Sequence, residues 1–145
     1  MITRIDHIQL AAPKGSEPAA REFYGSILGL PEIEKPISLR ARGGCWFQCG
    51  DQQLHIGVEP DFHPAKKAHP AFAVSDLARL REALQAHAVK ITDDNSLPGT
   101  RRFYTEDPWG NRLEFLEPSS CNSRRQRSTR QFRRKGSLES SERKP

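Results

Sequence analysis

The chain has 145 residues and a net charge of +5, and its composition is 35% hydrophobic and 28% charged. This length allows one domain or two very small ones, and no stretch reaches the roughly 18 apolar residues that a membrane helix needs. Residues 1–15 lack the apolar core and the small-residue cleavage site of a secretory signal, so we expect a cytoplasmic protein.

The positive charge is concentrated in residues 119–145. This segment contains nine Lys or Arg and two Glu, whereas residues 1–118 carry a slight negative charge. It is rich in Ser, Arg and Gln and poor in large apolar residues, which predicts a disordered basic tail. Arginine-rich segments bind nucleic-acid phosphates. This one has no periodicity and no interleaved aromatic residues, so we interpret it as a solvated extension and keep nucleic-acid binding only as a third hypothesis.

The three cysteines, Cys45, Cys49 and Cys121, are an odd number, which argues against a disulfide framework. Cys45 and Cys49 lie four residues apart in a predicted strand and therefore share one face. We interpret both as small core residues rather than as catalytic thiols.

The first half of the chain is predicted to contain one helix among four strands. The predicted elements are, in order, a strand at residues 3–11, a helix at 18–29, and strands at 32–41, 45–49 and 52–59. Ser16 is a candidate cap for the helix, and Gly29 ends it. Gly50 and Asp51 have the composition of a hairpin turn between the last two strands.

The same order of elements returns in the second half of the chain. The predicted elements there are a strand at 69–75, a helix at 76–88 that begins near Asp76, and strands at 89–93, 100–106 and 112–117. Such an internal repeat predicts an α+β fold of two tandem βαβββ modules, at residues 1–59 and 68–118.

The repeat places four metal-binding side-chain types at equivalent positions. His7 in the first strand of one module corresponds to His69 in the other, and His55 in the last strand corresponds to Glu114. The apolar neighbours of these residues point to the opposite strand face. Because two copies of one unit are usually related by an approximate two-fold axis, we expect the four side chains to converge.

Four sequence segments carry a resemblance to a known family: DHIQLAAP, FYGSILGLP, HPAFAV and FYTEDPWGNRLEFLEP. On these segments, residues 3–118 resemble the vicinal oxygen chelate superfamily. This superfamily includes glyoxalase I, extradiol dioxygenases, methylmalonyl-CoA epimerase, fosfomycin-resistance thiol transferases and bleomycin-resistance proteins.

The resemblance implies paired modules whose sheets curve around a divalent metal, with His7, His69 and Glu114 as ligands. His55 falls where glyoxalase I has a Glu ligand, so it is a fourth ligand or a catalytic base. Two imidazoles and a carboxylate suit Fe, Mn, Ni or Zn and leave positions open for a substrate with two neighbouring oxygens. These ligands do not select the metal or the reaction.

Further site residues follow from strand position. We predict a catalytic role for Tyr104, as in fosfomycin-type enzymes, although Gln9 stands where those enzymes favour Thr. The predicted substrate-binding residues are Gln9, Trp46 and Arg102, with Phe47 and Arg101 as the alternatives of opposite parity. His63 and His87 are interpreted as surface residues.

The sequence therefore predicts a metal-dependent glyoxalase-like enzyme, of lyase, isomerase or dioxygenase type, that acts on a small oxygen-rich molecule. The alternative is a metal-free protein that sequesters a ligand, as bleomycin-resistance proteins do. We expect a homodimer, and the cavity lies either within one chain or between partners. The enzyme hypothesis requires His7, His69 and Glu114 to converge on one point.

Overall fold

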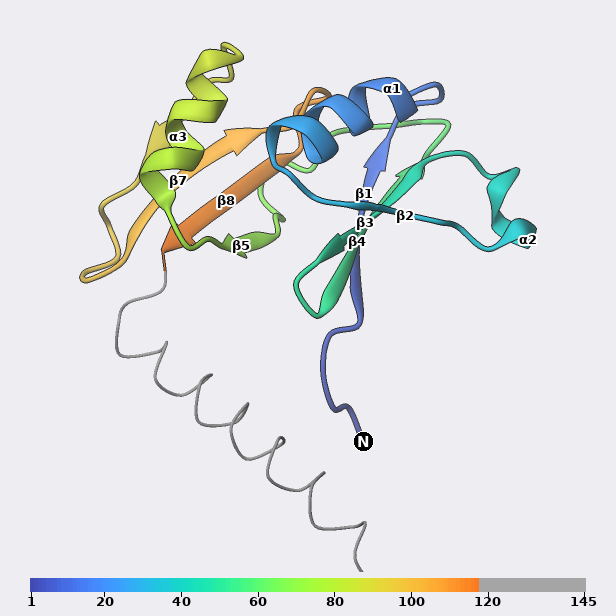
Figure 1. Cartoon of the computed structure of the whole chain (residues 1–145), viewed down its shortest axis with the longest axis horizontal. Coiled ribbons are helices and arrows are strands. Elements are labelled where there is room, and N and C mark those ends of the chain that lie inside the picture. Colours follow the sequence, from blue (N-terminus) through green and yellow to red (C-terminus); the bar gives the residue numbers. More distant parts are fainter. Residues whose placement is uncertain (118–145) are drawn as a thin grey trace, which may run out of the picture.

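The computed structural model describes residues 1–117, which form two sheets of four strands each (Figure 1). The elements are β1 (His7–Ala12), α1 (Glu17–Ala20), η1 (Arg21–Ile27), β2 (Glu32–Ile33), α2 (Ile37–Arg40), β3 (Cys45–Cys49), β4 (Gln52–Val58), β5 (Ala71–Ala73), α3 (Leu77–Ala86), β6 (Thr92–Asp93), β7 (Arg101–Glu106) and β8 (Arg112–Glu117). None of the helices in this range is long and apolar enough to cross a membrane. The predicted basic tail at 119–145 lies outside the described residues.

The two sheets have the same topology. The first sheet has the strand order β1-β4-β3-β2, and the second has the order β5-β8-β7-β6. In each sheet the first strand of the module pairs in parallel with the last strand, and the other pairings are antiparallel. The predicted α+β fold of two βαβββ modules is therefore confirmed.

The strand register decides which side chains share a sheet face. His55 lies opposite both Gln9 and Trp46 in the first sheet. Tyr104 lies opposite Glu114 in the second sheet. Because directly opposite residues of neighbouring strands point to the same side, each sheet has one face that carries the predicted site residues.

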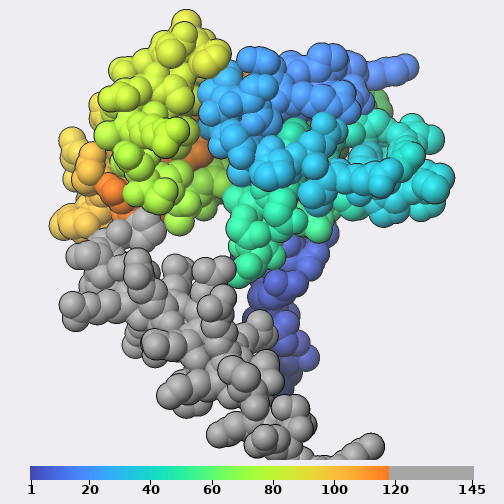
Figure 2. All heavy atoms as spheres, viewed as in Figure 1, coloured from blue at the N-terminus to red at the C-terminus, as the bar shows by residue number. Residues whose placement is uncertain are grey.

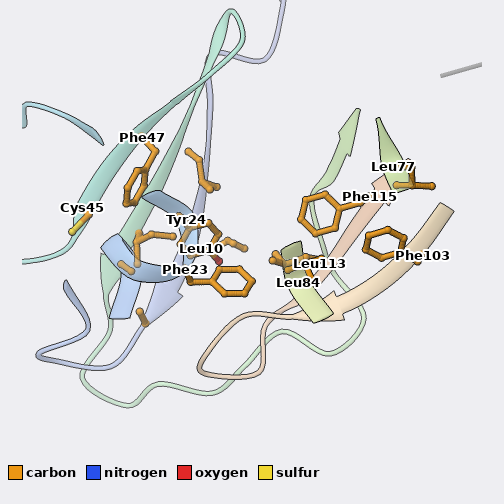
Figure 3. Close-up of a cluster of buried hydrophobic side chains, with 14 residues drawn as sticks. Leu10, Phe23, Tyr24, Cys45, Phe47, Leu77, Leu84, Phe103, Leu113 and Phe115 are labelled. Atoms are coloured by element: carbon orange, nitrogen blue, oxygen red, sulfur yellow. The ribbon is translucent and has the colours of Figure 1, made fainter. Parts of the chain in front are cut away.

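The other face of each sheet is apolar and packs beneath the helices. Figure 3 shows the buried side chains in two groups, one around Phe47 in the first module and one around Phe103 and Phe115 in the second. Phe47 and Phe103 are completely buried. The alternation of apolar and polar residues along each strand thus separates a core face from a polar face.

The modules are joined by their helices and by a buried polar network. Helix η1 of the first module lies beside α3 of the second, and α1 lies farther from it (Figures 1 and 2). The Tyr24 hydroxyl on η1 donates a hydrogen bond to Asp107 Oδ2 in the β7–β8 turn (2.9 Å). The Asn111 side chain bridges this carboxylate and the carbonyl oxygen of Ala11 on β1 (2.7 and 2.8 Å).

The helix expected at 18–29 differs from a regular α-helix. It begins as the four-residue α1 and continues as η1, a π-helix in which the Leu28 N–H donates to the Phe23 carbonyl oxygen (2.9 Å). Ser16 occupies the N-cap position, but its side chain makes no capping hydrogen bond. The predicted cap at Asp76 is confirmed, because its side chain accepts a hydrogen bond from Arg79 N (3.0 Å).

Four predicted strands, at 3–11, 32–41, 69–75 and 89–93, are clearly shorter than expected, with observed bounds His7–Ala12, Glu32–Ile33, Ala71–Ala73 and Thr92–Asp93. The strand predicted at 32–41 ends at Ile33, and the helical turn α2 follows Pro36, which has no N–H for a strand ladder. The strand predicted at 69–75 comprises only β5, so His69 lies just before it. The carbonyl oxygen of Pro70 still accepts a hydrogen bond from Glu114 N (3.0 Å), which keeps His69 beside β8.

Candidate functional site

One half of the candidate site is the pair His69 and Glu114. The Nε2 atom of His69 lies 3.0 Å from Glu114 Oε2. Glu114 is buried at 7% relative exposure on the polar face of the second sheet. These two residues are 45 positions apart in sequence, and the parallel pairing of β5 with β8 brings them together.

The partner of His69 Nδ1 indicates which of the two ring nitrogens carries the proton. Nδ1 lies 2.8 Å from the carbonyl oxygen of Lys67. Because a carbonyl oxygen can only accept, Nδ1 must carry the proton. In a neutral His69 ring, Nε2 and the carboxylate oxygen of Glu114 then face each other as two electron-pair donors. A cation shared by both atoms satisfies this arrangement.

The other half of the candidate site is a stack of three rings on the first sheet. The His55 ring lies between Trp46, with centroids 3.9 Å apart at an interplanar angle of 3°, and His7, with centroids 4.3 Å apart at 18°. His55 Nε2 also lies 2.9 Å from Gln53 Oε1. His7 Nδ1 lies 3.2 Å from Asp6 Oδ2, which leaves His7 Nε2 available as a ligand.

The stacked geometry separates the roles of His7 and His55. An imidazole nitrogen directs its lone pair in the plane of its ring. Two nearly parallel rings 4.3 Å apart therefore cannot both direct a lone pair at one ion. In this arrangement the two histidines do not act together as ligands of a single metal.

Burial changes the acidity of two candidate groups in the first module. It lowers the pKa of His55, and the neighbouring His7 lowers it further, so His55 is neutral at neutral pH. Burial also raises the pKa of the Cys45 thiol to about 11. A thiol with this pKa is almost entirely protonated at neutral pH, in agreement with its interpretation as a core residue.

The two halves do not combine within one chain. Throughout residues 1–117, no three His, Cys, Asp or Glu side chains are gathered so that they could hold a metal ion. The structure brings His69 to Glu114 and His7 to His55, but it does not bring His7 to the other pair. Within the described part of one chain, the predicted ligands therefore form two separate pairs and not one complete set.

The remaining predicted residues lie on the polar faces beside these pairs. Gln9 and Trp46 share the face of His55, whereas Phe47 is in the core. Tyr104 makes an edge contact with the His69 ring, with centroids 5.4 Å apart. Arg102 Nη1 donates to Glu114 Oε1 (3.1 Å), whereas Arg101 lies on the opposite face.

Two features beside Tyr104 were not predicted from the sequence. Asp94 Oδ2 accepts a hydrogen bond from Arg102 Nη2 (2.9 Å), and nothing in the local sequence indicates this loop-to-strand contact. The guanidinium of Arg112 lies over the Tyr104 ring, 3.9 Å from its centroid. Arg112 and Tyr104 line a groove of about 630 Å³ whose apolar wall includes Phe23 and Val89.

The donor types of His7, His69 and Glu114 suit a divalent metal, although residues 1–117 of one chain do not bring the three together. His7 and His69 each donate one ring N–H to an oxygen outside the ligand set, Asp6 or Lys67. This outer hydrogen bond is the usual arrangement for metal-bound histidines, because it fixes the tautomer and orients the ring. His63 and His87 are exposed and lie apart from these faces.

The comparisons with known proteins agree with this fold. Residues 4–115 match the family model described as the Glyoxalase/Bleomycin resistance protein/Dioxygenase superfamily, so the chain belongs to this superfamily. None of the curated proteins matches the sequence significantly.

Solved structures supply more specific relatives. A Bacillus anthracis protein assigned to the glyoxalase family is 51% identical, with a TM-score of 0.79, over 81% of this chain and 96% of that one. Lactoylglutathione lyase from Agrobacterium tumefaciens is 21% identical, with a TM-score of 0.64, over 81% and 96%. A fosfomycin resistance protein from Listeria monocytogenes, in complex with Mn(II) and 1S,2S-dihydroxypropylphosphonic acid, is 20% identical, with a TM-score of 0.69, over 83% and 95%. The last two similarities show the fold alone.

Proposed function

We propose that the chain is a metal-dependent enzyme of glyoxalase type whose site forms between two copies of the chain. One copy contributes His7, and the other contributes His69 and Glu114. The orientation of His69 carries this proposal, because its Nδ1 lies 2.8 Å from the Lys67 carbonyl oxygen and its Nε2 lies 3.0 Å from the buried Glu114 carboxylate. His7, which is exposed and has its own outer hydrogen bond, supplies the missing nitrogen.

The proposed reaction acts on a small substrate with two neighbouring oxygens. A bound divalent ion supplies Lewis acidity that stabilises negative charge on such oxygens. His55 acts as the base that removes the substrate proton, since its ring is neutral and its stacking does not suit joint ligation with His7. Gln9, Trp46 and Arg102 contact the substrate, and Tyr104 lies beside them, where it also lines the groove.

Arg102 retains one donor that suits substrate binding. Its Nε–H is buried and has no acceptor among the described residues. A buried donor of this kind is costly unless an oxygen of a ligand or water accepts from it. This supports contact with a substrate oxygen beside Glu114.

Metal content tests the proposal first. We expect the protein, reconstituted anaerobically with Fe, Mn, Ni or Zn, to retain about one ion per site, and the His7→Ala, Glu114→Ala double variant to retain none. His63→Ala, which changes an exposed histidine outside the site, is the matched control. Equal uptake by the double variant and the wild type would contradict the proposal and favour a metal-free, ligand-sequestering protein.

Mixed dimers test whether the site is shared between chains. His7→Ala and Glu114→Ala each abolish both sites of a homodimer. When the two variants are co-expressed, a mixed dimer regains one intact site, so random pairing restores about a quarter of the wild-type metal content. A site built within one chain would regain nothing, and that result would overturn the shared site.

A further inference from the structure

The position of Glu114 depends on a neighbouring group of three side chains. Arg102 on β7 donates from Nη1 to Glu114 Oε1 (3.1 Å) and from Nη2 to Asp94 Oδ2 (2.9 Å). Its Nη2 also lies 3.1 Å from Ser96 Oγ. We call Asp94, Ser96 and Arg102 the carboxylate clamp.

The carboxylate clamp is partly shielded from water. The side chains of Arg102 and Asp94 are 16% and 25% exposed, and that of Glu114 is 9% exposed. Exposed ion pairs contribute little because water screens them. Pairs that are hydrogen-bonded and shielded, like these two, hold their geometry more firmly.

The two oxygens of Glu114 therefore have different partners. Oε1 accepts from Arg102, whereas Oε2 faces His69 Nε2. Because the Arg102 guanidinium holds Oε1, this oxygen is not available to a metal that binds on the Oε2 side of the carboxylate. The remaining oxygen is the one that lies beside the second nitrogen ligand.

We propose that the carboxylate clamp positions Glu114 so that it binds the metal through Oε2 alone, and that Asp94 acts on the metal site through Arg102. This inference rests on the proposed function, since it concerns a ligand of the proposed metal. Asp94 is a positioning residue that touches neither the metal ligands nor the groove. Arg102 positions Glu114 with its Nη atoms and keeps Nε for the substrate.

Cobalt binding tests this proposal with a readout other than activity. In Asp94→Asn, the carboxylate is replaced by an isosteric amide, and Arg102 loses its charged anchor. We expect Asp94→Asn and Arg102→Met to weaken Co²⁺ affinity about 10-fold to 100-fold, as loss of an outer-shell partner usually does. We also expect both variants to have weaker visible Co²⁺ absorption. Once Arg102 no longer holds Oε1, Glu114 can bind through both oxygens, which raises the coordination number of the metal.

Two further variants separate positioning from a general loss of structure. Arg102→Lys keeps the charge and should restore part of the affinity. Arg101→Met removes the same charge from the same strand on the opposite face, where Arg101 pairs with Glu117 (2.8 Å), and should leave Co²⁺ affinity and spectrum unchanged. Thermal unfolding of each metal-free variant shows whether it is folded.

Different results identify which proposal fails. If Asp94→Asn and Arg102→Met bind Co²⁺ within twofold of the wild type with the same spectrum, the carboxylate clamp does not position the ligand. If the wild type binds no Co²⁺, or if Glu114→Ala binds it equally well, the proposed function fails and the carboxylate clamp fails with it.

Discussion

Single buried polar residues mark both halves of the candidate site. His55 and Glu114 are 5% and 7% exposed, each on the polar face of its sheet. Strand alternation was sufficient to predict that both lie on the polar face, because their neighbours on either side are apolar. It was not sufficient to predict Asp94, whose role depends on a contact between a loop and Arg102.

Glu17 provides a test of pH dependence at a single residue. Its Oε1 accepts a hydrogen bond from Gly44 N (2.7 Å), and this bond lowers the pKa of Glu17 below its usual 4.5. A lowered pKa in the folded state adds stability above the unfolded-state value, and this stability is lost as pH falls through the folded-state value. We expect Glu17→Gln to reduce the free energy of unfolding by about 1 kcal/mol at neutral pH.

The difference between Glu17→Gln and the wild type should shrink as the pH falls below 4.5. Urea unfolding at neutral and acid pH measures it. Glu22→Gln, which alters an exposed carboxylate on the next turn, serves as the control. It should leave the free energy of unfolding nearly unchanged at both pH values. An equal loss for Glu17→Gln in acid would show that the ionised carboxylate is not the cause.

Among the elements, those with strong alternation were predicted best. The strand at Cys45–Cys49 has the predicted bounds, and the strand at Arg101–Glu106 differs by one residue. The weakest prediction was residues 32–41, where Pro36 starts a helical turn instead of continuing the strand. The π-helix could not be predicted, because nothing in its local sequence distinguishes it from an α-helix.

The start of β3 depends on a glycine that no other residue can replace. Gly44 has a φ of +81°, and a Cβ there would lie 2.0 Å from the carbonyl oxygen of Ile56. Gly50 also has a positive φ, +59°, but a Cβ there would meet nothing within 4 Å. Alanine substitutions at Gly44 and Gly50 therefore distinguish the cost of a steric clash from the cost of the backbone conformation.

We expect Gly50→Ala to lower the free energy of unfolding by about 1 kcal/mol, the cost of a left-handed backbone. Gly44→Ala should lose about 3 kcal/mol or more, because the β3–β4 pairing must shift as well. Chemical denaturation of both variants gives the comparison. Similar losses at the two positions would argue that the close approach to Ile56 is relieved at little cost.

In the whole molecule, the core spans both modules, but the candidate site does not. The core is continuous across the two modules, whereas the predicted ligands remain in two pairs within one chain. The repeat was sufficient to predict both modules and the equivalence of His7 with His69. It was not sufficient to predict how two polar faces meet, because that depends on surfaces between modules or between chains.

The Asp107 network provides a test of how firmly the modules are joined. The Asp107 carboxylate accepts hydrogen bonds from the Tyr24 hydroxyl, the Asn111 side chain, and the backbone N–H groups of Trp109 and Asn111. We expect Asp107→Ala to lower the free energy of unfolding by about 3–5 kcal/mol, since it leaves several buried donors unpaired. Tyr24→Phe, which removes one of these bonds, should cost about 1.5 kcal/mol.

Urea unfolding of Asp107→Ala and Tyr24→Phe measures the two losses. A single transition for both variants would show that the modules still unfold together. If Asp107→Ala lost no more than Tyr24→Phe, the network would be a local feature of the turn and not a joint between modules.

The stacking of Trp46 on His55 has an optical consequence. An indole in face-to-face contact with an imidazole, 3.9 Å away, is sensitive to the electronic state of that ring. The other tryptophan, Trp109, packs against the core away from this stack. In a Trp109→Phe background, the fluorescence of Trp46 therefore reports events at the His7 half of the site, and it gives a label-free signal with which metals and small molecules can be screened.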